Sequence, residues 1–228
     1  MTDISIIITA HREGILAGAT IHSALQAIAH AEAEGASTEC IGVLDKTDDL
    51  TRSIISNALA GRATLIETDH GDPGQSRNSG IDAASGRFAT FLDGDDLWSE
   101  NWLSAAWRAA SDRPDAVWHS HCNIVFGQQR NLWWHVDSEG PLYDPDYMAW
   151  ANYWDAMSFA ATDIYRDLPF RANDLPAGFG HEDWHWNMQT LSRGIAHKPV
   201  LDTLHFKRRR ARSQMSLVSK HDAVIWPD

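Results

Sequence analysis

Three carboxylates lie within four residues of the sequence, in Asp93-Gly94-Asp95-Asp96. Charges so close together repel one another unless a cation lies among them, and hard oxygen ligands are those that Mg²⁺ and Mn²⁺ prefer. A divalent ion held there could bind a diphosphate and neutralise a leaving group, which is Lewis-acid chemistry. The alternative is an acidic turn that caps the next helix, as Asp-Gly sequences often do. The four residues alone favour neither interpretation.

A second acidic pair, Glu182-Asp183, lies in the second half of the sequence. Adjacent residues point in different directions on a helix, so one carboxylate could deprotonate a nucleophile while the other binds a substrate hydroxyl. The simpler explanation is a helix N-terminus, where the macrodipole favours acidic residues.

The same segment contains His181-Glu182-x-x-His185, a pattern in which two histidines bind zinc in hydrolases. The extended form of this motif fails, because Met188 and Leu191 stand where a glycine and a third histidine belong. Asp202 remains as a distant third ligand. A zinc hydrolase would leave the acidic clusters of the N-terminal half unexplained, so this is a minor alternative.

Residues 207–212 carry five cations in six positions of a chain whose net charge is −12. A solvated surface strip is the default interpretation of such a run. Against so acidic a background, the run more readily binds a diphosphate or docks on anionic lipid head groups.

The elements that must position these residues alternate between strand and helix signals. Short β-branched, apolar runs predict strands, and apolar residues three and four positions apart predict helices. The expected strands are 4–8, 40–45, 63–68, 88–92 and 116–126. The expected helices end near Ala33, cover 74–84, follow a cap at Ser99, and cover 182–191.

Polar clusters follow three of these predicted strands, at 9–13, 45–49 and 93–96. A βαβαβ pattern requires right-handed crossovers and a parallel sheet covered by helices. Ligands of such sheets bind beyond the carboxyl ends of the strands. We therefore expect an α/β fold whose mostly parallel central sheet gathers these clusters at one edge.

Composition excludes several classes of protein. With 43% hydrophobic and 22% charged residues, the chain is neither disordered nor fibrous. Its negative charge disfavours nucleic-acid binding, and two cysteines cannot make a disulfide framework. We expect no signal peptide or spanning helix and a cytoplasmic location. Eleven tryptophans are several times the ordinary share, which fits either core packing or stacking on sugar rings.

Taken together, these motifs resemble the inverting GT-A glycosyltransferases of the family 2 type. The resemblance rests on 4–10, 74–86, 91–96, 178–183 and the stretch ending in Ser213-Gln214-Met215-Ser216. It covers nearly the whole chain and is weakest at about 127–170. It implies a GT-A (Rossmann-like) fold in one domain over 1–228, in which 1–115 binds a nucleotide sugar and 116–228 binds the acceptor and supplies the base.

The resemblance also implies roles for individual residues. Asp183 would be the general base, with Glu182 beside it binding a hydroxyl group. Asp95 and Asp93 would bind Mn²⁺ or Mg²⁺, joined by His205. The residues expected to contact the nucleotide sugar are Thr9, His11, Glu13, Asp45, Arg77, Asp93, Arg209 and Arg210, and those expected to contact the acceptor are Trp184 and Trp154.

The implied activity is metal-dependent transfer of a sugar, a UDP-hexose by default, to a hydroxyl of a glycan or lipid-linked acceptor. Arg209 or Arg210 stands where the family usually has histidine, and a permanent cation there can stabilise the leaving diphosphate. The run 207–212 could also contact a membrane peripherally. The main alternative is a non-catalytic module that binds glycans or nucleotide sugars.

Overall fold

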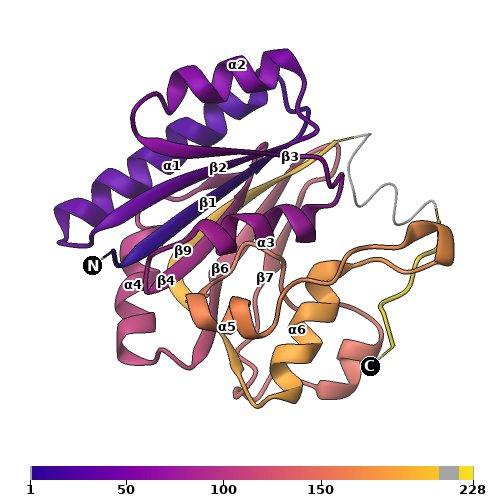
Figure 1. Cartoon of the computed structure of the whole chain (residues 1–228). Coiled ribbons are helices and arrows are strands. Elements are labelled where there is room, and N and C mark those ends of the chain that lie inside the picture. The colour runs from indigo at the N-terminus through magenta and orange to yellow at the C-terminus, as the bar shows by residue number, and fades with distance from the viewer. Residues whose placement is uncertain (1, 211–220, 228) are drawn as a thin grey trace.

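The computed structural model in Figure 1 describes residues 2–210 and 221–227. Its strands are β1 (Ile4–Ala10), β2 (Thr38–Asp45), β3 (Ala63–Thr68), β4 (Phe88–Asp93), β5 (Leu97–Trp98), β6 (Ala116–Gly127), β7 (Asn131–Trp134), β8 (Phe159–Ala161) and β9 (Ala196–Arg209). In the described part of the chain they form one mixed sheet in the order β3-β2-β1-β4-β8-β6-β9-β5, with β7 paired to β6.

Helices cover both faces of this sheet (Figure 1). The α-helices are α1 (Leu16–Ala33), α2 (Asp49–Ala58), α3 (Pro73–Ala83), α4 (Trp102–Asp112), α5 (Thr162–Asp167) and α6 (Glu182–Ser192), and the 3-10 helices are η1 (Pro145–Ala149) and η2 (Leu175–Ala177). No helix in the described ranges combines the length and the apolar character that crossing a bilayer requires.

Strand β1 is buried along its whole length, as its run of β-branched residues predicts. On one face Ile6 belongs to a core cluster with Ile21 of α1 and Leu103 of α4. On the other face Ile7 packs in a second cluster with Ile81 of α3. Apolar side chains on both faces therefore fix β1 at the centre of the sheet.

Strands β3, β2, β1 and β4 run parallel to one another. Their register pairs Thr9 with Asp93 across β1 and β4, and Asp45 with Thr68 across β2 and β3. The carboxyl ends of these strands thus share one edge, where ligands of such sheets bind. The predicted α/β architecture with a mostly parallel central sheet is confirmed.

The predicted strands are all present, with ends shifted by at most two residues. The sequence pattern does not predict α2 or β9. The backbone N–H of Thr51 donates to the side chain of Asp48 at 2.8 Å, which caps α2. The acidic turn at 45–49 therefore also starts a helix.

The prediction that Ser99 caps the following helix is wrong. Helix α4 begins at Trp102, after Asn101, and that residue makes no side-chain cap. The hydroxyl of Ser99 instead accepts a hydrogen bond from the backbone N–H of Leu204 in β9, at 3.0 Å. The Ser99 hydroxyl, which the local sequence pattern assigns to the helix cap, is therefore hydrogen-bonded to β9, more than a hundred residues away in sequence.

Strand β9 runs parallel to β6 along the whole length of β6, from the pair Ala116–Ala196 to the pair Gly127–Arg209. The ladder is irregular between Ser120 and Cys122. Because β9 runs parallel to β6 over this length, its basic end reaches the edge where the parallel strands of the N-terminal half terminate.

The close packing of α3 on β1 can be tested with Gly80→Ala. A Cβ built on Gly80 lies 2.4 Å from Cγ2 of Ile7, a buried β-branched side chain with little freedom to move. We expect the free energy of unfolding to fall by about 1–2 kcal/mol, although alanine is the better helix former. Urea unfolding followed by circular dichroism measures the change.

The matched control is Gly18→Ala in α1, where a Cβ lies 3.8 Å from Ile54. This position has room, so the better helix propensity of alanine should raise stability by up to about 1 kcal/mol. Equal stabilisation by both substitutions would contradict the packing argument.

Candidate active site

A cavity of about 1050 Å³ opens at the edge where the parallel strands end. Its lining comes from the loops after β1, β2 and β4, the start of α3, the start of α6 and the end of β9. The sequence-predicted site residues that line it are Thr9, His11, Glu13, Asp45, Arg77, Asp93, Asp95, Glu182, Asp183, Arg209 and Arg210. The structure thus brings most of the predicted residues to one place.

Asp45 is buried at the end of β2, and its carboxylate is tied to the next loop. It accepts hydrogen bonds from the backbone N–H groups of His70 and Gly71, each at 2.7 Å, and from the hydroxyl of Thr68 at 3.0 Å. The ring nitrogen Nδ1 of His11 lies 2.7 Å from the backbone oxygen of Asp45. Asp45 therefore orders this wall of the cavity.

Each of the three clustered carboxylates at 93–96 has a cationic partner. Oδ1 of Asp93 lies 2.8 Å from Arg77, and Oδ2 of Asp95 lies 2.6 Å from Nε of Arg210. Asp96 accepts a hydrogen bond from a backbone N–H in β9 at 2.6 Å, and its Oδ2 lies 3.8 Å from Nζ of Lys207. Side chains of the protein itself therefore offset the repulsion that the sequence pattern implies.

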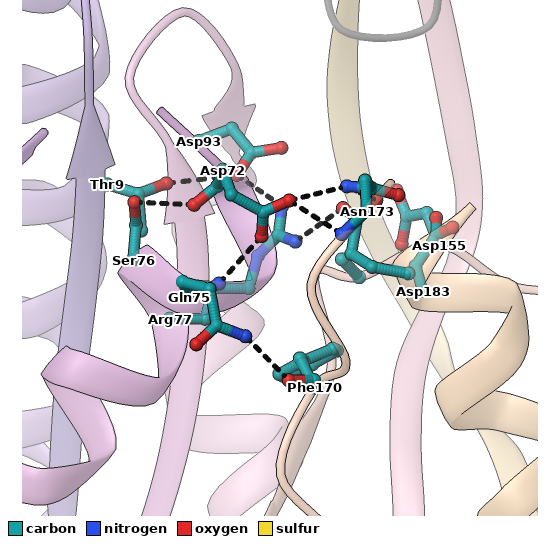
Figure 2. Close-up of polar contacts among 12 residues, drawn as sticks. Thr9, Asp72, Gln75, Ser76, Arg77, Asp93, Asp155, Phe170, Asn173 and Asp183 are labelled. Atoms are coloured by element: carbon teal, nitrogen blue, oxygen red, sulfur yellow. Dashed lines mark hydrogen bonds and ion pairs between the residues drawn. The ribbon is translucent and has the colours of Figure 1, made fainter. Parts of the chain in front are cut away.

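Arg77 connects the two acidic motifs (Figure 2). Its side chain is 3% exposed, with one nitrogen 2.8 Å from Asp93 and another 3.0 Å from Glu182. Burial would raise the pKa of Asp93, but the charges of Arg77 and Lys207 outweigh it and hold that pKa below its ordinary value. The guanidinium thus joins the two acidic motifs, 89 residues apart in sequence.

Asn173 strengthens the same connection (Figure 2). Its backbone N–H and its side-chain amide both donate to Oδ2 of Asp72 at 2.9 Å, and the amide also donates to Glu182 at 3.1 Å. The other oxygen of Asp72 caps α3 by accepting from the backbone N–H of Gln75. Both carboxylate oxygens of Glu182 are therefore hydrogen-bonded within the protein.

Asp183 differs from its neighbour, because no side chain elsewhere in the described chain hydrogen-bonds its carboxylate. It accepts from the backbone N–H of Trp184 at 2.8 Å and lines the cavity. Burial first, and then the negative charge of Glu182, raise the pKa of Asp183 to about 7, although Lys207 and Arg77 act to lower it. A carboxylate with this pKa can accept a proton near neutral pH.

The basic end of β9 closes the cavity on the remaining side. Nζ of Lys207 lies 3.1 Å from Asp155, which is 1% exposed. Burial alone would lower the pKa of Lys207, but Asp155 and Asp96 outweigh it and raise that pKa above its ordinary value. Arg208, Arg209 and Arg210 line the cavity. Arg212 lies outside the described residues.

Two predicted site residues, His205 and Trp154, lie in the core and not at the cavity. His205 is fully buried, with its ring 4.6 Å from that of Trp102, and burial lowers its pKa to about 3. Trp154 is also fully buried, with its ring stacked on that of His119, and it donates its indole N–H to the backbone oxygen of Val136 at 2.8 Å. Neither lines the cavity, because alternation along a strand and aromatic packing direct both side chains into the core.

Trp184 is half-buried, and its indole N–H donates to the backbone oxygen of Met148 at 2.9 Å. Its role toward an acceptor stays a prediction.

The zinc alternative requires His181 and His185 to share one face of a helix. His181 lies outside α6 with φ 60°, so it does not share a helical face with His185. Within 2–210 and 221–227, no group of three or more His, Cys, Asp or Glu side chains is arranged to hold a metal ion.

The sequence analysis does not identify Asp155, which pairs with Lys207, or Asn173, which hydrogen-bonds Glu182. Asp155 lies in an aromatic stretch, and Asn173 lies in an irregular loop, so neither has a local pattern that marks it. Lys207 is identified in the sequence as part of the basic run, but its ion pairs with Asp96 and Asp155 are not predicted.

The sequence profile described as Glycosyl transferase family 2 matches residues 5–170. A search of curated proteins finds no match to the chain.

Two solved structures illustrate the similarity in fold. Staphylococcus aureus TarS 1–349 in complex with UDP-GlcNAc is 18% identical, with a TM-score of 0.63, over 94% of this chain and 61% of that one. The mannosyltransferase PcManGT from Pyrobaculum calidifontis in complex with GDP-Man and Mn²⁺ is 15% identical, with a TM-score of 0.66, over 93% of this chain and 59% of that one. This chain therefore spans less than two thirds of the length of these neighbours.

Both neighbours are glycosyltransferases with the GT-A fold, and the parallel sheet and strand-end cavity described above are of the same kind. At such low identity the likeness establishes the fold alone. The family profile, in contrast, covers well over half of the sequence. The chain therefore belongs to glycosyl transferase family 2 and has its GT-A fold.

Proposed function

We propose that this chain is a metal-dependent inverting glycosyltransferase that moves a sugar from a nucleoside diphosphate donor to a hydroxyl group of its acceptor. The observation that carries the proposal is the position of Asp183. Its carboxyl group has a pKa of about 7 and lines the same cavity as Asp93, Asp95 and the basic end of β9. A proton acceptor and groups suited to a diphosphate thus share one cavity.

In the proposed reaction, the carboxylate of Asp183 takes the proton of the acceptor hydroxyl. The acceptor oxygen attacks the anomeric carbon, and the bond from that carbon to the diphosphate oxygen breaks on the opposite face. A single displacement of this kind inverts the configuration of the sugar. Glu182 is occupied by Arg77 and Asn173, so its proposed part is to raise the pKa of Asp183 and to hold the start of α6.

Negative charge grows on the diphosphate as the bond breaks. Arg208, Arg209 and Arg210 line the cavity, and fixed cations near developing negative charge lower the barrier. Because Arg210 is paired with Asp95, a diphosphate has to compete with that carboxylate for the guanidinium.

The carboxylates of Asp93 and Asp95 fit Mn²⁺ or Mg²⁺, since both supply hard oxygen ligands at the cavity wall. Mg²⁺ commonly binds through one or two carboxylates together with substrate phosphates. The ion pairs of these carboxylates with Arg77 and Arg210 support a position that favours positive charge. When bound, the ion would act as a Lewis acid toward the diphosphate.

A UDP-linked hexose is the proposed donor. The TarS structures contain UDP-GlcNAc and UDP, whereas the mannosyltransferase contains GDP-Man. These ligands support a nucleoside diphosphate sugar as the class, and the base and the sugar are left to experiment.

A glycan or a lipid-linked oligosaccharide is the proposed acceptor, and the cytoplasm is the proposed location. Membrane contact through 207–212 stays a prediction. Residues 207–210 line the cavity, which favours the diphosphate role for that part of the run.

Asp183→Asn tests the base. The substitution keeps the size of the side chain and removes its ability to accept a proton, so we expect kcat for transfer to fall by about 10²–10⁴. The Kd for a nucleoside diphosphate, measured by isothermal titration, should change by less than about twofold. Asp163→Asn, at an exposed carboxylate on α5, is the control. Full transfer activity of Asp183→Asn would remove Asp183 from this role.

The pH dependence follows from the same group. Because a base must be deprotonated, kcat/KM, which reports groups of the free enzyme, should rise with pH to a plateau, with a midpoint of about 7. Since the pKa is raised in the folded protein, the stability that the protonated form contributes is lost as pH rises through 7. Asp183→Asn should therefore raise the Tm relative to wild type more at pH 8 than at pH 5. An equal effect at both values would contradict the raised pKa.

Nucleotide titration tests the donor site. UDP, GDP and dTDP would each be titrated with and without Mn²⁺ into the wild type, Asp95→Ala and the control Asp163→Asn. We expect one nucleotide to bind at least about tenfold more tightly with Mn²⁺, and Asp95→Ala to lose this gain because a metal ligand is missing. The transferase proposal fails if no nucleotide binds under any metal condition.

A further inference from the structure

Residues 221–227, named here the strap, lie against the loop that precedes α6 (Figure 1). The backbone N–H of Gly180 donates to the oxygen of Val224, and the N–H of Val224 donates to the oxygen of Gly178, both at 2.9 Å. Phe179 and Val224 form a parallel bridge. The strap thus adds a short extended pairing to the residues just before the Glu182-Asp183 motif.

Trp226 holds the strap in place through its ring. The ring stacks on Phe179, with centroids 4.2 Å apart and planes at 15°, and Cζ of Arg171 lies 3.9 Å from the ring centroid. The indole N–H donates to the backbone oxygen of Ala172 at 3.0 Å. Trp226 therefore joins both arms of the loop at 171–181, by stacking, a cation–π contact and a hydrogen bond.

His181 lies between the strap and the base, in a strained conformation. Its φ of 60° is left-handed, which costs a residue other than glycine about 1–3 kcal/mol. Its backbone oxygen accepts the first hydrogen bond of α6, from the N–H of His185 at 3.0 Å. The backbone of Ala223, a buried residue of the strap, lies close enough to the His181 ring to act on it and raise its pKa, against the lowering by burial.

Such strain persists only where the surroundings impose the conformation. The strap contacts His181 directly through Ala223 and contacts the preceding Gly180 through Val224. The conformation of His181 sets where α6 begins, and Asp183 is the second residue of that helix. A change at His181 would therefore turn the carboxylate of Asp183 within the cavity.

We propose that the strap positions the catalytic base, with Trp226 as the positioning residue that keeps His181 in its left-handed conformation. The inference rests on the proposed function of Asp183. Among the described residues that line the cavity, none belongs to the strap, so Trp226 acts through His181 and not on the substrate.

Hydrogen–deuterium exchange of Trp226→Ala tests the positioning without reference to activity. We expect amide exchange at 180–186 to rise by about tenfold or more, while exchange in α1 and α3 stays within about twofold of wild type. Trp226→Phe keeps the stack on Phe179 and should restore most of the protection. Trp134→Ala, at a half-exposed tryptophan on β7, is the matched control and should change nothing at 180–186.

Kinetics test the consequence for the base. In Trp226→Ala we expect kcat to fall by about tenfold or more, with nucleotide Kd within about twofold, because the donor side is untouched. The charged groups that face Asp183 are Glu182, Arg77, Lys207 and Asp155, and none lies on the strap. Release of the strap should expose Asp183 to water and loosen its contact with Glu182, and both changes lower its pKa, so the midpoint of the pH profile should move down by at least about half a unit.

Three results would overturn the proposal. Wild-type exchange at 180–186 in Trp226→Ala would mean that the strap does not hold His181. Faster exchange throughout the protein would mean general destabilisation. Faster local exchange with unchanged kcat and pH midpoint would mean that the strap orders the loop without positioning the base. If the wild type transfers no sugar, the proposed function fails, and the exchange experiment alone decides whether the strap holds His181.

Discussion

Arg77 lies buried between two carboxylates that come from distant parts of the sequence, Asp93 at the end of β4 and Glu182 at the start of α6. Removing one partner of such a buried network typically costs about 3–5 kcal/mol, because the remaining charges lose their compensation. The network also fixes geometry, since a guanidinium with two bound carboxylates has little freedom to turn. The distance across the cavity, from the clustered aspartates to the proposed base, therefore depends on this one side chain.

Ion pairs between side chains of the protein also occur elsewhere in the cavity wall. Asp95 is paired with Arg210, and Asp96 and Asp155 share Lys207. An anionic donor that contacts Lys207 or Arg210 has to compete with these carboxylates for the cation, and a divalent ion, when bound, would offset the charge of the carboxylates. Asp183 is the exception among these acids, because the charge that affects its pKa most is that of another carboxylate, Glu182. That difference in partners gives two adjacent acids, Glu182 and Asp183, different chemical roles.

The tryptophans show how composition can mislead about function. Their excess suggests sugar stacking, yet Trp98, Trp102, Trp154 and Trp186 are all buried. Large aromatic side chains fill the space between the sheet and α4 or α6. Most of the indole N–H groups with known partners bond to backbone oxygens, which ties irregular loops to the core. The ring that matters most for the proposed base, Trp226, does so from outside the cavity.

The sequence by itself determined the strands buried on two faces, the acidic and polar clusters at their ends, and the family motifs, because these features depend on local patterns of burial and backbone conformation. It also identified Asp183 and Asp95 as residues for chemistry. Only the tertiary structure decided which acid of the pair at 182–183 is bound by Arg77 and Asn173, and that His205 and Trp154 belong to the core. It alone decided that β9 delivers its cations to the aspartates. The reason is that charge pairing and side-chain direction depend on contacts between residues about a hundred positions apart, which no local pattern encodes.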